Sequence, residues 1–400
     1  MPSITRALLL VASFASFIFA QNAPPKPFGF GAQTTGGGSL PPNIPNSPSQ
    51  LVSWLADDVP RVILIDRTFD FSDFQGNTTG QGCAPWPKCP GSNQVQHARN
   101  AMGWCSQHCS SKNTIEVTYR VAATNPIPIG HNKTLRGVGD KGIIRGRGLL
   151  VFRTSNIIIQ NIHITDLNPH LVWGGDSLMI NGGQNIWVDH CTFSYIGRQM
   201  VVIDIGKNTG ITLSNNNFQG FTTWSSTCTN KHYWAVLLTG SGDTITMANN
   251  CFEQTSGRSP KLGGSGSPHV DVHYYNNLHT QISGQSLEIA RGGRMLAEGN
   301  LFQEVHPTNP DQALTELGGR AYVPMTAEET EKCQAYLGRS CVGNQEVNVN
   351  STGPFGPIKF GKSLTALTDF EGVAYIRTAN IRPAHELKNG PPGGCGHGLI

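Results

Sequence analysis

The stretch DTITMANNCF, residues 243–252, decides the fold, because it belongs to a series of short β-branched segments that end in asparagine. Aligned at that asparagine, the segments recur at steps of 23 to 34 residues. Repeats of this length predict a solenoid, and strands without helices between them predict a parallel β-helix. The aligned positions are Asn161, His190, Asn216, Asn250, Asn277 and Asn300.

Each coil of such a solenoid stacks on the previous one at the strand spacing of ~4.8 Å. We therefore expect the aligned asparagine side chains to form a hydrogen-bonded ladder inside one turn. An antiparallel sandwich or a propeller is the alternative, but it predicts hairpin turns between neighbouring strands. Asn-Gly pairs are sparse, with Asn181-Gly182 as the main example, which favours the parallel all-β solenoid.

Outward from this repeat, the chain divides into four parts. Residues 1–20 are expected to be a signal peptide, since a basic start precedes an apolar run that is too short to span a membrane. Residues 21–50 form a Pro/Gly/Ser-rich leader, residues 51–354 a single β-helix domain, and residues 355–400 a tail to which we assign no role. Short helices are expected at 51–56 and 326–337. The expected strands are 61–66, 114–119, 142–144, 156–164, 185–193, 210–218, 243–252, 269–275 and 295–302.

The composition is that of a secreted protein that does not bind nucleic acid or membranes. The chain has 400 residues with 29 basic and 26 acidic side chains, and only 14% are charged. Glycosylation acceptor sequences begin at Asn77, Asn132 and Asn350, which is consistent with secretion. We expect an extracellular monomer.

Ten cysteines indicate an oxidising compartment and disulfides rather than a zinc site. The repeat places Cys191 and Cys251 in the same register two coils apart, which is ~9–10 Å. A disulfide needs Cα atoms within ~7 Å of each other. We therefore expect these two cysteines to be small buried thiols.

The residues most suited to chemistry lie in the heptad TSGRSPK, residues 255–261. Arg258 and Lys261 place two cations three residues apart, as an anionic or carbonyl-bearing substrate would require. A solvated surface loop is the alternative for this heptad. Several tryptophans among the loops indicate a platform for sugar rings, although any single one can be a core residue. The candidate residues on the coils are Trp187, Asp189, Arg198, Trp224, Trp234, Arg258 and Lys261, and the early cysteine-rich loop adds Trp86 and Trp104.

Seven segments occur in a fixed order along the chain: Gly82-Cys83-Ala84-Pro85-Trp86, Val172-Trp173-Gly174-Gly175-Asp176, Ile186-Trp187-Val188-Asp189-His190, Ile196-Gly197-Arg198-Gln199, His232-Tyr233-Trp234, the heptad 255–261 and Leu296-Ala297-Glu298-Gly299-Asn300. With these segments, the chain from about residue 27 to 342 resembles the secreted pectin lyases of fungi, in the pectate lyase superfamily (polysaccharide lyase family 1). That resemblance implies a right-handed parallel β-helix with long loops that form a substrate groove.

The resemblance implies eliminative endo-cleavage of methyl-esterified (1→4)-α-D-galacturonan, with pectin as the partner. Arg258 matches the arginine that removes the proton from C5 of the uronate, and Lys261 and Asp189 match neighbouring active-site positions. Trp86, Trp104, Trp187 and Trp234 match the aromatic cleft, and we add Trp224 and Arg198 as substrate-binding candidates. An arginine base needs help from burial and from nearby charge, because its pKa ordinarily exceeds ~12.

The resemblance also implies the disulfides Cys83–Cys105, Cys89–Cys228 and Cys333–Cys341. It leaves Cys109 and Cys395 without assigned partners.

The sequence is compatible with two alternatives for calcium. Pectin lyases tend to carry an arginine where pectate lyases hold calcium, and the matching position here is interpreted as Gly210. Asp204 and Asp189 match two calcium-binding carboxylates, which fall short of the six to eight oxygens that calcium takes. We expect no cofactor, with a calcium-assisted pectate lyase as the alternative.

Two other functions on the same scaffold are less well supported. A hydrolase would need clustered aspartates, and Asp189 has no neighbouring aspartate. A non-catalytic pectin-binding protein would use the tryptophans but would have no need for Arg258 and Lys261.

Overall fold

The computed structural model describes residues 25–91, 93–349 and 357–400 of the chain. The expected signal peptide and the acceptor Asn350 lie outside these residues. Within them, the helices are too short and too polar to cross a bilayer. The six α-helices are α1 (Pro48–Ala56), α2 (Trp104–His108), α3 (Ala327–Lys332), α4 (Gln334–Leu337), α5 (Thr365–Thr368) and α6 (Ala374–Thr378).

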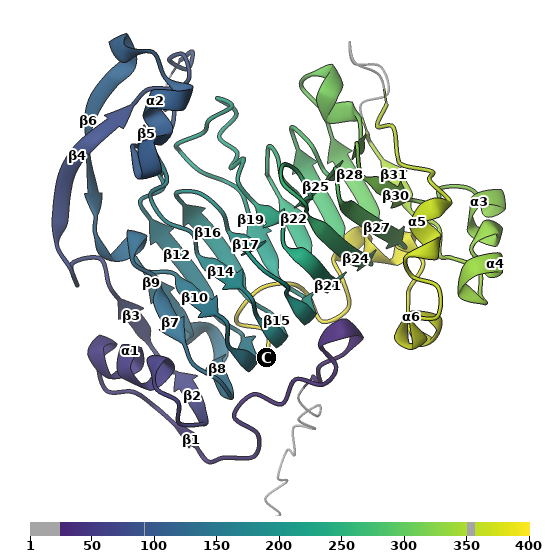
Figure 1. Ribbon diagram of the computed structural model, residues 1–400, viewed down its shortest axis with the longest axis horizontal. Helices are drawn as coiled ribbons and strands as arrows, with labels where there is room; N and C mark the ends of the chain where they lie inside the picture. Colours follow the sequence, from purple (N-terminus) through teal and green to yellow (C-terminus); the bar gives the residue numbers. More distant parts are fainter. Residues whose placement is uncertain (1–24, 92, 350–356) are drawn as a thin grey trace, which may run out of the picture.

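The body is a right-handed parallel β-helix whose coils stack along one axis, as the repeat predicts (Figure 1). Three parallel sheets run along that axis. Sheet 1 contains β1 (Pro42–Asn43), β2 (Arg61–Ile65), β8 (Lys133–Gly137), β11 (Ser155–Gln160), β15 (Gln184–Asp189), β18 (Thr209–Ser214), β21 (Ser241–Ala248), β24 (His269–Tyr275), β27 (Gly293–Glu298) and β30 (Arg320–Tyr322). Sheet 2 contains β7 (Ile127–Ile129), β10 (Leu149–Phe152), β14 (Leu178–Asn181), β17 (Val201–Asp204), β20 (Val236–Leu238), β23 (Lys261–Leu262), β26 (Glu288–Ala290) and β29 (Glu316–Leu317). Sheet 3 contains β3 (Thr68–Asp70), β9 (Ile143–Arg145), β12 (His163–Leu167), β16 (Thr192–Ile196), β19 (Asn217–Gln219), β22 (Cys251–Glu253), β25 (Leu278–Ile282), β28 (Leu301–Val305) and β31 (Gln345–Val347).

A fourth, smaller sheet stands beside the coils at the N-terminal half (Figure 1). It is built largely from the polar, cysteine-rich segment between β3 and β7. Its strands are β4 (Asn77–Cys83), β5 (His97–Arg99), β6 (Thr114–Arg120) and β13 (Leu171–Val172). Helix α2 follows β5 in the chain and lies beside it (Figure 1).

The asparagine ladder is confirmed over five coils. Asn216 donates to Asn250 (3.0 Å), Asn250 to Asn277 (2.9 Å), and Asn277 to Asn300 (3.0 Å). Asn300 then continues the ladder to Asn344 (2.8 Å). Each amide is fully or almost fully buried, so these bonds satisfy polar groups that would otherwise be costly inside the core.

The ladder register at Asn161 and His190 is wrong by one residue. The strand pairing aligns Cys191, not His190, with Asn216, because Thr192 pairs with Asn217. Asn161 and His190 instead occupy the preceding corner, where both have a left-handed backbone (φ 57° and 50°). The equivalent corner residues in later coils, Asn215, Asn249, Asn276 and Gly299, share this conformation.

These corners also divide the expected long strands. Residues 156–164 split into β11 and β12 around Asn161, and residues 185–193 split into β15 and β16 around His190. A residue with a left-handed backbone leaves the extended conformation, so it bends the chain and ends the strand. The predicted strands that run across such a corner therefore contribute to two sheets rather than one.

The register error explains the wrong prediction for Cys251. One residue shifts a side chain from the inner to the outer face of a sheet. Cys191 points inward as a free buried thiol, as expected, whereas Cys251 lies on the other face and is bonded to Cys395 of the tail.

Two of the three implied disulfides are confirmed, Cys89–Cys228 and Cys333–Cys341. The third is wrong, because Cys83 pairs with Cys109 and leaves Cys105 as a buried thiol. All three sulfur atoms lie within 4.8 Å of one another.

The leader covers the outer face of sheet 1. Backbone N–H groups of Phe30, Gly31 and Gly37 donate to the hydroxyls of Thr246, Thr212 and Thr134, respectively, at 2.9 to 3.0 Å. These threonines lie on three different coils. The leader thus closes a face that would otherwise be open to solvent.

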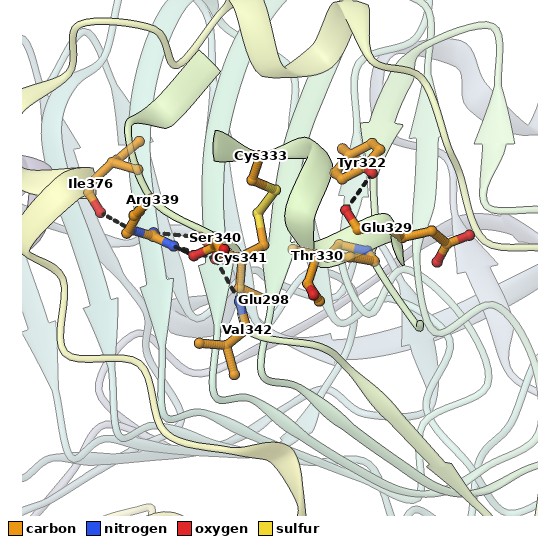
Figure 2. The surroundings of a disulfide bond; sticks show 12 residues. Glu298, Tyr322, Glu329, Thr330, Cys333, Arg339, Ser340, Cys341, Val342 and Ile376 are labelled. Atoms are coloured by element: carbon orange, nitrogen blue, oxygen red, sulfur yellow. Dashed lines mark hydrogen bonds and ion pairs between the residues drawn. A yellow bond between two sulfur atoms is a disulfide. The ribbon is translucent and has the colours of Figure 1, made fainter. Parts of the chain in front are cut away.

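The tail runs back along the solenoid and also packs against its C-terminal end (Figure 1). There the buried carboxylate of Glu298 receives two hydrogen bonds from Arg339 (2.7 and 2.8 Å) and one from His273 (3.0 Å). Figure 2 shows this carboxylate near the Cys333–Cys341 disulfide. These partners lower the pKa of Glu298 to about 2 although burial opposes them.

Candidate active site

Three adjoining clefts form a groove above sheet 2. The central cleft, of about 460 Å³, shares Trp173 and Arg198 with one neighbour and Trp86 and Trp234 with the other. The neighbours measure about 450 and 430 Å³. A continuous groove of this kind suits an extended polymer rather than a small compact ligand. The central cleft is lined by Pro85, Trp86, Trp104, His108, Val172, Trp173, Arg198, Gln199, Trp234, Leu237 and Arg258.

Arg258 lies in the central cleft, and its local structure follows from its neighbours in the heptad. Gly257 has no Cβ, and one added there would come within 2.4 Å of the Tyr233 ring, so only glycine allows this close packing. The Ser259 hydroxyl bonds to Thr255 (2.7 Å) and donates to the Gly257 carbonyl (3.0 Å), which fixes the turn on both sides of the arginine.

The Arg258 guanidinium lies 4.6 Å from the centre of the Trp234 ring and 5.9 Å from that of Tyr233. Its Nε atom is buried and has no hydrogen-bond partner among the described residues. Burial lowers the pKa of Arg258, and the positive charge of Arg198 lowers it further, while Glu288 and Tyr233 oppose this shift. An arginine in this environment gives up its proton more readily than one in water.

Lys261 follows three residues later on β23 and forms an ion pair with Glu288 of the neighbouring strand β26. Its backbone pairs in register with Leu237, which lines the central cleft. The structure therefore places Lys261 on the same face of sheet 2 as Arg258's cleft.

Arg198 lines both the central cleft and the cleft toward the N-terminal coils. It forms a two-point ion pair with Asp176, with Nε–Oδ1 at 2.9 Å and Nη2–Oδ2 at 2.5 Å. Its guanidinium stacks on the Trp173 ring at 3.6 Å, and Asp176 also accepts from the Gln199 N–H (2.8 Å). This geometry holds a fixed positive group within the groove.

Asp176 and Trp173 are functional residues that we did not assign from the sequence. Both stand in the quoted segment Val172-Trp173-Gly174-Gly175-Asp176, which was the available signal. Asp176 meets its partner Arg198 only after the chain has completed one coil, since the two side chains are 22 residues apart.

Three of the predicted tryptophans line the groove. Trp86 and Trp234 lie between the central and C-terminal clefts with ring centres 6.4 Å apart. Trp104, carried by α2, stacks on His108 with a spacing of 4.2 Å and an interplanar angle of 7°. Flat aromatic faces in a row are suited to the apolar faces of sugar rings.

Trp187 and Asp189 do not reach this groove. Trp187 is 2% exposed on sheet 1, in the same row as Thr212 under the leader, and its Nε1 donates to Ser214 (2.9 Å). Asp189 is fully buried at the end of the same strand. Its carboxylate accepts hydrogen bonds from Gln160, His190, Ser214 and Asn215 at 2.7 to 3.0 Å.

The predicted catalytic role of Asp189 and the predicted substrate contact of Trp187 therefore have no support in the geometry. Both carboxylate oxygens of Asp189 are already bound inside the protein, and the leader covers the face on which Trp187 lies. Both residues stabilise the corner between sheets 1 and 3.

Trp224 lines a different cleft, of about 280 Å³. It lies there with His170, whose ring centre is 5.9 Å away, and with Arg120. None of the residues around Arg258 lines this cleft. The structure thus separates Trp224 from the groove that contains the other candidates.

The two carboxylates named for calcium do not come together. Asp204 ends β17 of sheet 2, where it accepts from Ile205 N–H and the Thr239 hydroxyl, whereas Asp189 is enclosed on sheet 1. In the part of the chain that is described, the one cluster of three metal-type side chains is Cys83, Cys105 and Cys109. The residues do not fit the calcium site that we considered.

Gly210 is also not the position that corresponds to a cleft arginine. It lies on β18 beneath the leader, where an added Cβ would come within 2.7 Å of Asn185 Oδ1 and 3.3 Å of the Phe30 carbonyl. Arg198 is instead the arginine that lies beside Arg258 in the cleft.

Comparisons with known proteins agree with this architecture. A family model described as pectate lyase matches residues 105–317. A probable pectin lyase A of Aspergillus clavatus is 40% identical over 83% of this chain and 85% of its own length. Pectin lyase D of Aspergillus niger is 39% identical over 92% of this chain and 93% of its own.

Among solved structures, the chain resembles a pectate lyase from Bacillus sp. N165 in complex with trigalacturonate. That similarity has a TM-score of 0.55 at 19% identity, over 94% of this chain and 99% of the other. A pectate lyase bound to a hexasaccharide gives a TM-score of 0.57 at 18% identity, over 93% and 97% of the two chains. At this identity the likeness concerns the fold, whereas the family model and the sequence relatives concern descent. The chain belongs to the pectate lyase family.

Proposed function

We propose that this protein is a pectin lyase, which cleaves methyl-esterified (1→4)-α-D-galacturonan inside the chain by β-elimination. The observation that carries the proposal is Arg258, which lies in a tryptophan-lined groove with a buried, unpaired Nε and a lowered pKa. The relatives named pectin lyase support the same activity.

In this mechanism the neutral guanidine of Arg258 takes the proton from C5 of a uronate ester. The C5–H electrons form the C4=C5 double bond, and the C4–O4 bond breaks with its electron pair leaving on O4. Water supplies the proton that the leaving oxygen needs. The products are one chain with a new, unsaturated non-reducing end and one with a new reducing end.

The fixed charges beside Arg258 act on the intermediate. Negative charge builds up on the C6 carbonyl oxygen as C5 loses its proton, and Arg198 and Lys261 supply positive groups toward it. Such preorganised charge is commonly the largest contribution to rate in an enclosed site. Asp176 holds Arg198 in place through two hydrogen bonds and so acts as a positioning residue.

We further propose that the reaction needs no metal cofactor. A methyl ester already acidifies the C5 proton, and two cations on the same face of sheet 2, Arg198 and Lys261, take the place of an added one. The separation of Asp204 from Asp189 supports this over the calcium-assisted alternative.

The test is to incubate the protein with highly esterified pectin and, separately, with polygalacturonate, each with and without a chelator. We expect new ultraviolet absorbance from the C4=C5 bond on esterified pectin, unchanged by chelator. Activity on polygalacturonate alone that the chelator abolishes would replace the proposal with the calcium-assisted pectate lyase. Binding to pectin without any absorbance or new reducing ends would replace it with a non-catalytic binding protein.

We also propose that the protein acts outside the cell, as a monomer. The four disulfides among the described residues and the expected signal peptide support an oxidising, extracellular compartment. Detection of the mature chain in culture medium, and its mass in solution, would test both points.

A further inference from the structure

The two ends of the groove differ in charge. Toward the N-terminal coils, the groove is lined by Arg99, by the ion pair of Arg198 with Asp176, and by the apolar side chains Met102, Ala123 and Met179. Arg99 uses its Nε to donate to the Trp173 carbonyl (3.0 Å), and its guanidinium lies 5.1 Å from the Tyr119 ring centre.

Arg99 is an available cation at this end. None of the ion pairs among the described residues includes it, whereas Arg198 in the same cleft is paired with Asp176. Arginine presents two further nitrogen atoms beyond Nε, in a planar arrangement that matches a carboxylate.

Toward the C-terminal coils, the groove is lined by Asp311 with the neutral side chains Gln285, Asn309 and Gln312. Asp311 lies in the short 3₁₀-helix Pro310–Ala313, which Asn309 caps through the Gln312 N–H (3.1 Å). The Asp311 side chain is exposed and forms no ion pair among the residues described. No cation of the described part of the chain lines this cleft.

The order of the clefts places these two charges on opposite sides of Arg258. The central cleft shares one wall, Trp173 and Arg198, with the Arg99 end, and the other wall, Trp86 and Trp234, with the Asp311 end. A polysaccharide that follows the groove must therefore pass Arg99 on one side of the reacting unit and Asp311 on the other.

We propose that Arg99 and Asp311 give the enzyme an asymmetric preference for methyl esterification. At the Arg99 end a free galacturonate carboxylate is tolerated, because a cation faces it. At the Asp311 end a free carboxylate meets a like charge, so that position takes methyl-esterified units. This inference rests on the proposed function, because it concerns which pectin segments that same groove accepts.

The test uses homogalacturonan of intermediate, randomly distributed esterification, digested to an early stage. Tandem mass spectrometry then reads the ester state of the first few units on each side of the cleaved bonds. We expect free acids to be depleted on one side of the cleavage site and retained on the other. The experiment itself identifies which side corresponds to the non-reducing end.

Variants of Asp311 and Arg99 show which end of the groove binds which side of the cleaved bond. Asp311→Asn should raise the share of free acids on the depleted side by about three- to tenfold, the effect of removing one like charge at close range near a surface. Glu331→Gln, the same change on an exposed residue of α3, is the matched control and should leave the pattern unchanged.

Arg99→Gln should lower the share of free acids on the tolerant side by a similar factor. Arg99→Lys should restore it, since the charge is kept, and this separates charge from any displacement of Trp173. Equal ester content on both sides in the native digest, or no change with Asp311→Asn, would overturn the inference. A complete lack of unsaturated products would instead contradict the proposed function.

Discussion

Two sets of residues on this solenoid, each with one aspartate and one tryptophan, have different roles. Asp189 and Trp187 belong to sheet 1, where internal hydrogen bonds and the leader enclose them. Asp176 and Trp234 belong to the groove above sheet 2, where one orients Arg198 and the other contacts Arg258. Residue type alone therefore does not identify a functional site on this β-helix. The site lies on the face of the coils that the leader does not cover, above sheet 2.

The largest expected effect is the loss of turnover when Arg258 in the groove is replaced. Arg258→Ala should reduce turnover on esterified pectin by about 10²–10⁴-fold, the usual contribution of a positioned base. The free energy of unfolding should change by no more than about 2 kcal/mol, the size of a desolvated cation–π interaction. Initial rates of ultraviolet absorbance and urea unfolding measure the two quantities.

Arg153 provides the control for that variant. It also has a left-handed backbone (φ 55°) and an aromatic neighbour, Phe152, at 5.1 Å, but it lies outside the groove. Arg153→Ala should retain full turnover. A large loss of stability with Arg258→Ala would show that this arginine is structural and would remove the distinction between the two faces.

The enclosed aspartate should show the reverse pattern. Asp189→Ala leaves four buried donors without an acceptor, so we expect a loss of about 3–5 kcal/mol in unfolding free energy. Turnover per folded molecule should stay near the native value. If Asp189→Ala unfolds at the native temperature but has lost turnover, Asp189 is a catalytic residue and this prediction is wrong.

A third buried carboxylate, Glu298, extends the comparison to pH. Its pKa in the folded protein, about 2, is below its ordinary value near 4.5, so the fold favours the charged form. The stability that it contributes is complete above pH ~4.5 and is lost as the pH falls toward ~2. Urea unfolding between pH 5 and 2 should therefore show a decline for the native protein that is smaller for Glu298→Gln.

The difference between these two proteins isolates Glu298 from other acids. Asp243, for example, has its pKa raised to about 6 by burial and contributes a slope of opposite sign in both. Parallel stability curves for the native protein and Glu298→Gln would mean that the Arg339 and His273 contacts do not hold the carboxylate charged.

The smallest expected effects come from trimming the two tryptophans. Trp234→Phe should raise KM on pectin about three- to tenfold, because it weakens the aromatic wall and the contact with Arg258. Trp187→Phe should leave KM unchanged but cost about 1–2 kcal/mol of stability, since the hydrogen bond to Ser214 and some packing are lost. An equal rise in KM from both variants would contradict the claim that substrate contacts Trp234 and not Trp187.

The fold was predictable because the same asparagine pattern recurs along the sequence. The buried amides of these asparagines find hydrogen-bond partners only when the coils stack on one another. Asn216, Asn250 and Asn277 stand in pairs of consecutive asparagines, of which the first forms a left-handed corner and the second the ladder. Asn161 and His190 are corner residues without a ladder asparagine after them. Aligning them with the ladder gave the one-residue error, and with it the wrong state of Cys251.

The site was only partly predictable, for two physical reasons. Whether Trp187 faces solvent depends on the leader, which approaches sheet 1 from a part of the chain about 150 residues earlier and leaves no local signal at that position. Asp176 gains its role from Arg198 on the next coil, so its own segment does not reveal the partner. Arg258 and Lys261 were identifiable because their heptad contains both cations and the glycine that packs against Tyr233.

A crystal structure of Arg258→Ala bound to a methyl-esterified oligogalacturonide would test the assignment of the groove most directly. We expect the sugar chain to follow the groove past Trp86, Trp234 and Trp173, with one C5 facing the space left by the Arg258 side chain. An oligosaccharide bound instead in the cleft of Trp224, or at the face of Trp187 and Asp189 with the leader displaced, would contradict it.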